Sequence, residues 1–176
     1  MSCFKVAEKF VSINGEGPRA GELAVFLRFC GCNLNCGYCD TRWANTADVK
    51  YQLASAEELV AYVNSTGVKN VTLTGGEPLL QADIARLIVL LGASGAEVEI
   101  ETNGGVPLKD IVSLSPRPAV TADYKLPSSG MEKYMLTENF SYLTLRDAVK
   151  FVVGNMRDLA RAEEIINGYA LTDKCR

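Results

Sequence analysis

Short hydrophobic runs alternate along this chain with segments of helical periodicity. The runs that predict strands span residues 4–13, 23–29, 70–74, 97–101, 119–122 and 148–153. Helices are expected after a cap at Ser55 with Glu58 as its capping-box partner, over residues 81–91, and from a cap at Asn155 to about residue 166. Strands that alternate with helices predict parallel β/α units, here as a single α/β domain over residues 1–176.

The polar motifs of the chain follow the ends of these expected strands. A cysteine-rich loop comes after residues 23–29, and Gly75-Gly76-Glu77-Pro78 comes after residues 70–74. In β/α barrels the carboxyl ends of the strands carry the active site, so we expect the functional site there. The irregular stretch 126–141 is expected to be a long surface loop and a candidate cover that excludes water from that site.

Composition excludes several classes of function. The chain has 18 basic and 21 acidic residues without a basic run, so the footprint of a nucleic-acid binder is missing. No apolar stretch reaches the roughly 20 residues of a membrane span. The absence of histidine excludes His-dependent nucleophiles and metal sites. Six cysteines that do not form a disulfide framework favour the reducing cytoplasm.

Three cysteines, Cys32, Cys36 and Cys39, form a C-x3-C-x2-C triplet. Iron–sulfur clusters are normally held by four cysteines, so a triplet leaves one iron open to a chelating ligand. Structural zinc or buried thiols are the alternatives, but structural zinc usually needs four Cys or His ligands. Cys30 is expected to point away from the loop as a core residue. The spacing resembles that of the radical S-adenosylmethionine superfamily.

The segment Thr74-Gly75-Gly76-Glu77-Pro78 strengthens this resemblance. By itself it reads as a strand-to-helix turn in which glycines allow close backbone approach. After a cysteine triplet and at the next strand end, it resembles the superfamily segment that binds the methionine amine. The resemblance implies an open, partial (β/α) barrel, a 4Fe-4S cluster and S-adenosyl-L-methionine.

Further segments resemble the 7-carboxy-7-deazaguanine synthase family: residues 12–18, Cys39-Asp40-Thr41, Leu79-Leu80-Gln81 and residues 101–104. This family contracts the ring of 6-carboxy-5,6,7,8-tetrahydropterin to 7-carboxy-7-deazaguanine in queuosine biosynthesis. The implied reaction is a carbon–nitrogen lyase reaction, in which a radical abstracts and returns a hydrogen and ammonia is lost. The sequence departs from the family pattern at Asn14, where many members carry Gln, and at Asp123-Tyr124.

The resemblance also implies roles for individual residues. Substrate contacts are expected from Ile13, Asn14, Gly15, Glu16, Arg28 and Thr74. Cofactor contacts are expected from Tyr38, Cys39, Asp40, Gly76, Glu77, Asn103, Asp123, Tyr124 and Lys125. Thr41 is expected to ligate Mg²⁺, an ion that takes oxygen ligands. The structural alternatives are an ion pair for Arg28, a solvated carboxylate for Glu16 and a helix cap for Thr41.

Arg28 illustrates how position and chemistry combine. It should face the barrel interior if Leu27 and Phe29 face the helices. A buried guanidinium needs a partner, and its planar fork matches a carboxylate in a bidentate way. A structural ion pair would satisfy the same requirement, and the family resemblance favours a contact between Arg28 and the carboxylate of the substrate.

The resemblance further implies a homodimer and a flavodoxin- or ferredoxin-type reductant. Two other functions stay open: a glycyl-radical enzyme activating protein, which shares the triplet, and an iron–sulfur electron carrier or scaffold. Family members generally continue with a further strand and helix, so the sequence predicts that residues 1–176 lack a C-terminal segment. Without it, the edge of the last strand would be exposed.

Overall fold

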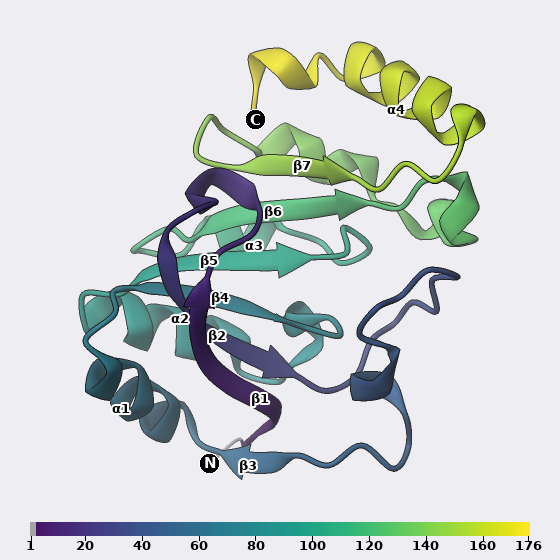
Figure 1. Cartoon of the computed structure of the whole chain (residues 1–176). Coiled ribbons are helices and arrows are strands. Elements are labelled where there is room, and N and C mark those ends of the chain that lie inside the picture. The colour runs from purple at the N-terminus through teal and green to yellow at the C-terminus, as the bar shows by residue number, and fades with distance from the viewer. Residues whose placement is uncertain (1–2) are drawn as a thin grey trace.

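The computed structural model of the protein describes residues 3–176 and is built around one seven-stranded sheet (Figure 1). Its strands are β1 (Phe4–Ile13), β2 (Leu23–Phe29), β3 (Gln52–Ala54), β4 (Asn70–Gly75), β5 (Glu97–Thr102), β6 (Ala119–Tyr124) and β7 (Ala148–Phe151). The order is β3-β1-β2-β4-β5-β6-β7, and the strands from β2 to β7 run parallel to one another. Strand β1 pairs antiparallel with β2 and β3, and the open, mostly parallel sheet confirms the partial β/α barrel expected from the sequence.

Within residues 3–176, four α-helices connect or follow the strands: α1 (Ala56–Thr66), α2 (Ile84–Ala93), α3 (Lys109–Val112) and α4 (Met156–Gly168). The capping box of α1 is confirmed, because the Glu58 amide donates to Ser55 Oγ over 3.2 Å and the Ser55 amide donates to the Glu58 carboxylate over 2.7 Å. Helix α2 begins later than predicted, since Pro78–Leu80 forms a 3-10 turn and Asp83 has a φ of 62°. The short elements β3 and α3 were not predicted.

Each parallel strand presents apolar side chains to the helices, and the opposite face carries polar side chains of these strands, among them Arg28, Thr74, Glu101, Asp123 and Lys150. The fully buried Leu27, Leu73 and Ile100 belong to a core that α1 and α2 complete. A second core lies under α4 and the last two strands. Burial of each such aliphatic side chain stabilises the fold by roughly 1.5–3 kcal/mol. The alternation of side chains along a strand then directs the intervening polar residues to the helix-free face.

The β1–β2 loop (residues 14–22) folds over this polar face. Asn14 Nδ2 donates to Glu99 Oε2 over 2.9 Å, which fixes the start of the loop to β5. Gly17 has a φ of 73°, and a Cβ there would overlap the side chains of Glu99 and Thr121. Only glycine therefore lets the loop lie this close to the sheet.

Residues 126–141 do not form the irregular surface loop that was predicted. They contain three short 3-10 helices, Pro127–Ser129, Glu132–Tyr134 and Thr137–Tyr142. Leu126 and Phe140 are buried in the second core, and the Asp158 carboxylate accepts from the Ser128 amide over 3.0 Å. These buried apolar side chains fix the segment against the second core despite its many turn-forming residues. We refer to residues 126–141 as the wall at 126–141.

The outer edge of β7 is partly paired. Arg176 N donates to Asp147 O, and Val149 N donates to Arg176 O, each over 3.0 Å. These two bonds flank Ala148 in the pattern of a parallel ladder. None of the helices in residues 3–176 is long and apolar enough to span a membrane.

Candidate active site

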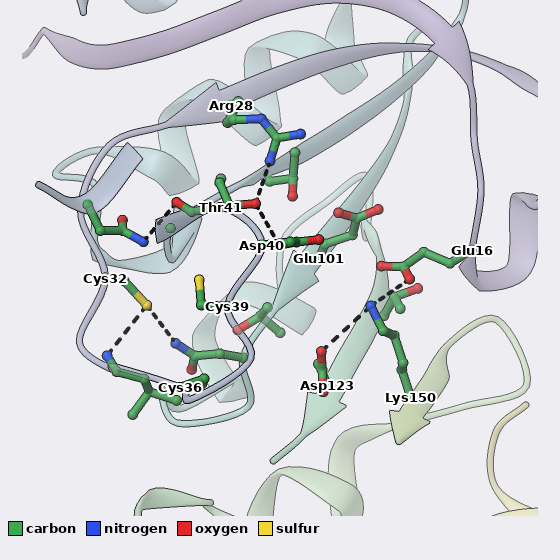
Figure 2. Close-up of a pocket in the computed structure, with 18 of the residues that line it drawn as sticks. Glu16, Arg28, Cys32, Cys36, Cys39, Asp40, Thr41, Glu101, Asp123 and Lys150 are labelled. Carbon is green, nitrogen blue, oxygen red and sulfur yellow. Dashed lines mark hydrogen bonds and ion pairs between the residues drawn. The ribbon is translucent and has the colours of Figure 1, made fainter. Parts of the chain in front are cut away.

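A cleft of about 390 Å³ opens on the polar face of the sheet, toward the carboxyl ends of the parallel strands (Figure 2). This volume is within the range of about 300–1,000 Å³ common for small-molecule sites. Most of the predicted site residues line it: Asn14, Gly15, Glu16, Arg28, Cys32, Cys36, Cys39, Asp40, Thr41, Thr74, Gly76, Asn103, Asp123 and Lys125. The fold thus brings together motifs that are far apart in the sequence.

Four predicted site residues lie outside the lining of the cleft: Ile13, Tyr38, Glu77 and Tyr124. The Ile13 side chain is exposed at the end of β1 and does not line the cleft. Tyr124 belongs to the second core, because the even positions of β6 face α4, and its hydroxyl donates to Glu132 over 3.1 Å. Burial raises the pKa of Tyr38 to about 12, and its ring lies 5.8 Å from the Lys125 ammonium.

The triplet cysteines lie together on the loop that follows β2, and all three border the cleft. Burial raises the pKa of the Cys36 thiol, the nearby Lys125 lowers it, and the neighbouring Cys32 and Cys39 raise it again. Cys30 is buried outside the cleft, as predicted. The three thiols are therefore close enough for Cys32 and Cys39 to influence the pKa of Cys36.

The donor set fits a cluster better than a single metal ion. Within residues 3–176, no three Cys, Asp or Glu side chains already converge on one metal position. An iron–sulfur cluster does not require such convergence, because each thiolate binds a different iron. Three soft donors without a histidine in the chain leave mononuclear zinc short of its usual four ligands.

The two glycines after β4 allow the loop after β2 to approach. A Cβ on Gly75 would overlap the backbone of Phe29, and one on Gly76 would overlap the carbonyl oxygen of Gly31. The Glu77 amide donates to Gly31 O over 2.8 Å. Close contact between the two strand ends explains the glycines, and it places the Gly76 backbone beside the cysteine loop.

The Glu77 side chain does not line the cleft, contrary to the cofactor contact predicted for this residue. It is fully buried, and its oxygens accept from Leu79 N over 3.0 Å, Thr102 Oγ1 over 2.9 Å and Asn103 N over 2.7 Å. Burial raises its pKa despite these three hydrogen bonds. The carboxylate joins the end of β4 to the end of β5, below the cleft floor.

Arg28 faces the cleft, while Leu27 and Phe29 face the helices as expected. Its Nε donates to Glu8 over 3.0 Å, and its Nη1 donates to Thr41 Oγ1 over 3.4 Å. A register shift in β1 between Val6 and Glu8 sets Glu8 opposite Arg28. The structural ion pair and the position in the cleft therefore both hold for this arginine.

Asn103 and the wall at 126–141 brace the cysteine loop. Asn103 Nδ2 donates to Asn33 Oδ1 over 2.7 Å and to Cys32 Sγ over 3.5 Å. From the other side, the Gly37 amide donates to Ser129 O over 3.0 Å. The segment therefore supports the cysteine loop. Among residues 3–176, none from 126–141 lines the cleft, so the segment does not form the predicted cover of the site.

Two charged residues of the cleft lining, Glu101 and Lys150, were not among the predicted contacts. Lys150 on β7 pairs with Glu16 over 2.6 Å. Glu101 on β5 lines the cleft; burial raises its pKa and a hydrogen bond with Thr74 lowers it. For both residues the sequence offered one signal, which is a charged side chain at a position of a hydrophobic strand that faces the barrel interior.

The fold and the cleft define the class of protein. Residues 27–119 match the Radical SAM superfamily, and the chain belongs to that superfamily. SuiB of Streptococcus suis, bound to its precursor peptide SuiA, shares the fold at 12% identity, with a TM-score of 0.60 over 82% of this chain and 36% of that one.

The particular family follows from nearer relatives. The chain is 55% identical over 172 residues to a 7-carboxy-7-deazaguanine synthase of Clostridium acetobutylicum, covering 97% of this chain and 78% of the relative. It is 41% identical over 166 residues to one of Methanospirillum hungatei, covering 94% and 68%. QueE from Escherichia coli matches with a TM-score of 0.75 at 29% identity, over 94% of this chain and 78% of that one. The chain belongs to the 7-carboxy-7-deazaguanine synthase family.

Proposed function

We propose that this enzyme contracts the ring of 6-carboxy-5,6,7,8-tetrahydropterin to 7-carboxy-7-deazaguanine with loss of ammonia, as a carbon–nitrogen lyase of queuosine biosynthesis. The observation that carries the proposal is one cleft that joins three thiols to Arg28 and Glu16. The thiols suit a cluster with one open iron. The guanidinium of Arg28 suits an anionic group of the substrate, and the carboxylate of Glu16 suits a nitrogen-rich edge. The alternative functions, an electron carrier and an activating protein, do not explain why Arg28 and Glu16 line the same cleft as the thiols.

The cofactor half would be held by the cysteine loop and the neighbouring strand ends. Cys32, Cys36 and Cys39 would bind the 4Fe-4S cluster, with Tyr38 and Asp40 next to them. Gly76, Asn103, Asp123 and Lys125 line the same cleft and would contact S-adenosyl-L-methionine. When bound, the two cofactors supply the hydrogen-atom abstraction that starts the reaction, and the protein supplies orientation and electrostatics.

The substrate half would be held by charged groups on the opposite side. The Arg28 guanidinium offers a planar fork to the substrate carboxylate. Glu16, with the backbone of residues 13–15, offers acceptors to the amino and N–H edge of the pterin. Thr74 and Glu101, near the ends of the neighbouring strands β4 and β5, also line the cleft. The charged groups at both ends fix the ring in one orientation over the strand ends.

We place Mg²⁺ at Thr41. Its hydroxyl donates to Asp40 Oδ1 over 2.8 Å and accepts from Arg28 Nη1 over 3.4 Å. A hydroxyl oxygen accepts twice, so one lone pair is left for a cation. Asp40 supplies a neighbouring hard oxygen, and substrate and water complete the shell that Mg²⁺ prefers.

Three further expectations follow from family membership: a flavodoxin- or ferredoxin-type reductant, a homodimer and a cytoplasmic location. The six cysteines do not have the spacing of a disulfide framework, which supports a reducing compartment.

The test is anaerobic reconstitution with iron and sulfide, followed by incubation with the carboxypterin, S-adenosyl-L-methionine, Mg²⁺ and a reductant. Mass detection should show 7-carboxy-7-deazaguanine, with many turnovers for each S-adenosyl-L-methionine present. The Cys39→Ala variant is the control and should form none. Consumption of one S-adenosyl-L-methionine for each turnover, or no product from a fully loaded enzyme, would overturn the proposal.

A further inference from the structure

Lys150 connects the β1–β2 loop to the sheet. Its Nζ lies 2.6 Å from Glu16 Oε2 and 3.6 Å from Asp123 Oδ2 (Figure 2). Lys125 Nζ lies 2.8 Å from the same Asp123 oxygen. Glu16, Lys150, Asp123 and Lys125 thus form a row of alternating charges that begins on the β1–β2 loop and ends beside the cysteine loop.

The charge of Lys150 offsets a local excess of carboxylates. Glu16 lies near Glu99 and Glu101, and its charge raises the pKa of both. Like charges in a partly buried cleft repel more strongly than they do in water. Burial opposes the charge of Lys150, but the hydrogen bond with Glu16 and the charge of Asp123 raise its pKa overall. Lys150 is therefore a cation at neutral pH and can pair with the Glu16 carboxylate.

The Glu16–Lys150 ion pair lies where the β1–β2 loop packs closely against the sheet, so a small movement of the loop would displace the Glu16 carboxylate. Glu16 adjoins Gly17, which is pressed against Glu99 and Thr121, and the loop crosses close to β6 and β7. Glu16 and Lys150 side chains are each 35% exposed, so the pair is reached by both solvent and ligand. An ammonium that binds one carboxylate oxygen leaves the other able to accept from a ligand N–H.

We propose that Lys150 is a positioning residue, which holds the Glu16 carboxylate in the orientation that receives the nitrogen-rich edge of the substrate. The inference rests on the proposed function in one respect, the contact between Glu16 and the substrate. Lys150 itself need not touch the substrate.

The first test needs no substrate. Hydrogen exchange of residues 14–22 is measured in the reconstituted protein, for wild type, Lys150→Met, Lys150→Arg and Lys109→Met. Lys109 is an exposed lysine on α3 outside the cleft and serves as the control. Exchange in this segment should be faster in Lys150→Met and should return toward wild type in Lys150→Arg. Equal exchange in wild type and Lys150→Met would overturn the inference.

The second test uses turnover by the reconstituted enzyme. Lys150→Met should raise the KM for the carboxypterin about tenfold, the lower end expected for a charge-assisted hydrogen bond, with a much smaller change in kcat. Because Lys150 acts through Glu16, the double variant with Glu16→Gln should lose little more than Glu16→Gln alone. Losses that multiply in the double variant, or an unchanged KM, would contradict this coupling.

The two tests separate the inference from the proposed function. If wild type forms no product, the proposed function fails, and the exchange measurement still decides whether Lys150 fixes the loop. If Lys150→Met does not fold, judged by circular dichroism, Lys150→Gln and Lys150→Arg provide the same comparison. A wild-type enzyme that turns over normally, with exchange and KM unaltered by these substitutions, refutes the inference alone.

Discussion

Glu77 offers a sharp test of how the cleft floor is built. Replacement by Gln keeps the shape of the side chain but turns one acceptor oxygen into a donor. Three groups now donate to the carboxylate, and the nearest, the Asn103 amide, does so over 2.7 Å. In Glu77→Gln at least one of them must face an amide N–H. A buried donor without a partner costs about 1–3 kcal/mol, so the variant should be less stable by that amount.

The pH dependence of this loss follows from the raised pKa of Glu77. Burial is its largest cause, and the hydrogen bonds oppose it only in part. A carboxyl whose pKa is raised in the folded state stabilises the fold below its unfolded pKa, and that contribution is lost as pH rises through the folded value. Gln does not titrate. The deficit of Glu77→Gln should therefore be largest near pH 4–5 and smaller at pH 8, with a slope below about 1.4 kcal/mol per pH unit.

The assay is urea unfolding of the cluster-free protein, followed by circular dichroism at several pH values. Glu163→Gln, at an exposed position on α4, is the matched control and should change stability by less than about 0.5 kcal/mol. Two results would refute the reasoning. One is a Glu77→Gln variant as stable as wild type at low pH, and the other is a deficit that grows as pH rises.

Three other substitutions test the cleft itself. Alanine at any triplet cysteine should abolish cluster assembly, whereas Cys30→Ala should keep nearly all cluster iron, measured by iron content and absorbance; iron loss in Cys30→Ala would mean that the ligands are misassigned. Arg28→Ala should weaken carboxypterin binding by one to two decades, as expected for a contact of about 1.5–3 kcal/mol, while the spectroscopic shift of the cluster on adding S-adenosyl-L-methionine stays unchanged. Unaltered pterin affinity would remove Arg28 from the substrate site. Thr41→Ala should reduce stimulation by Mg²⁺ in the turnover assay, and equal stimulation of both proteins would exclude Thr41 as a ligand.

The sequence by itself determined the chemistry and the order of elements. Cysteine spacing is local, so the triplet could be recognised without knowing how the chain folds. The Ser55 capping box, the Asn155 cap and the hydrophobic runs are local as well, and they placed α1, α4 and five parallel strands. Arg28 was assigned to the cleft because alternation along a strand fixes which residues share a face.

Tertiary structure decided which polar groups are available to a ligand. Two of the three donors to the Glu77 carboxylate, Thr102 and Asn103 at the end of β5, are 25 and 26 residues away, and Asn14 is bound to Glu99 across 85 residues. Residues 126–141 have the composition of a loop, yet contacts with distant apolar residues bury part of them. Lys150 acquires its neighbours only when β7 lies beside β6 and the β1–β2 loop folds over both. Local sequence specifies the donors and acceptors, but pairing them depends on long-range contacts that the sequence pattern does not encode residue by residue.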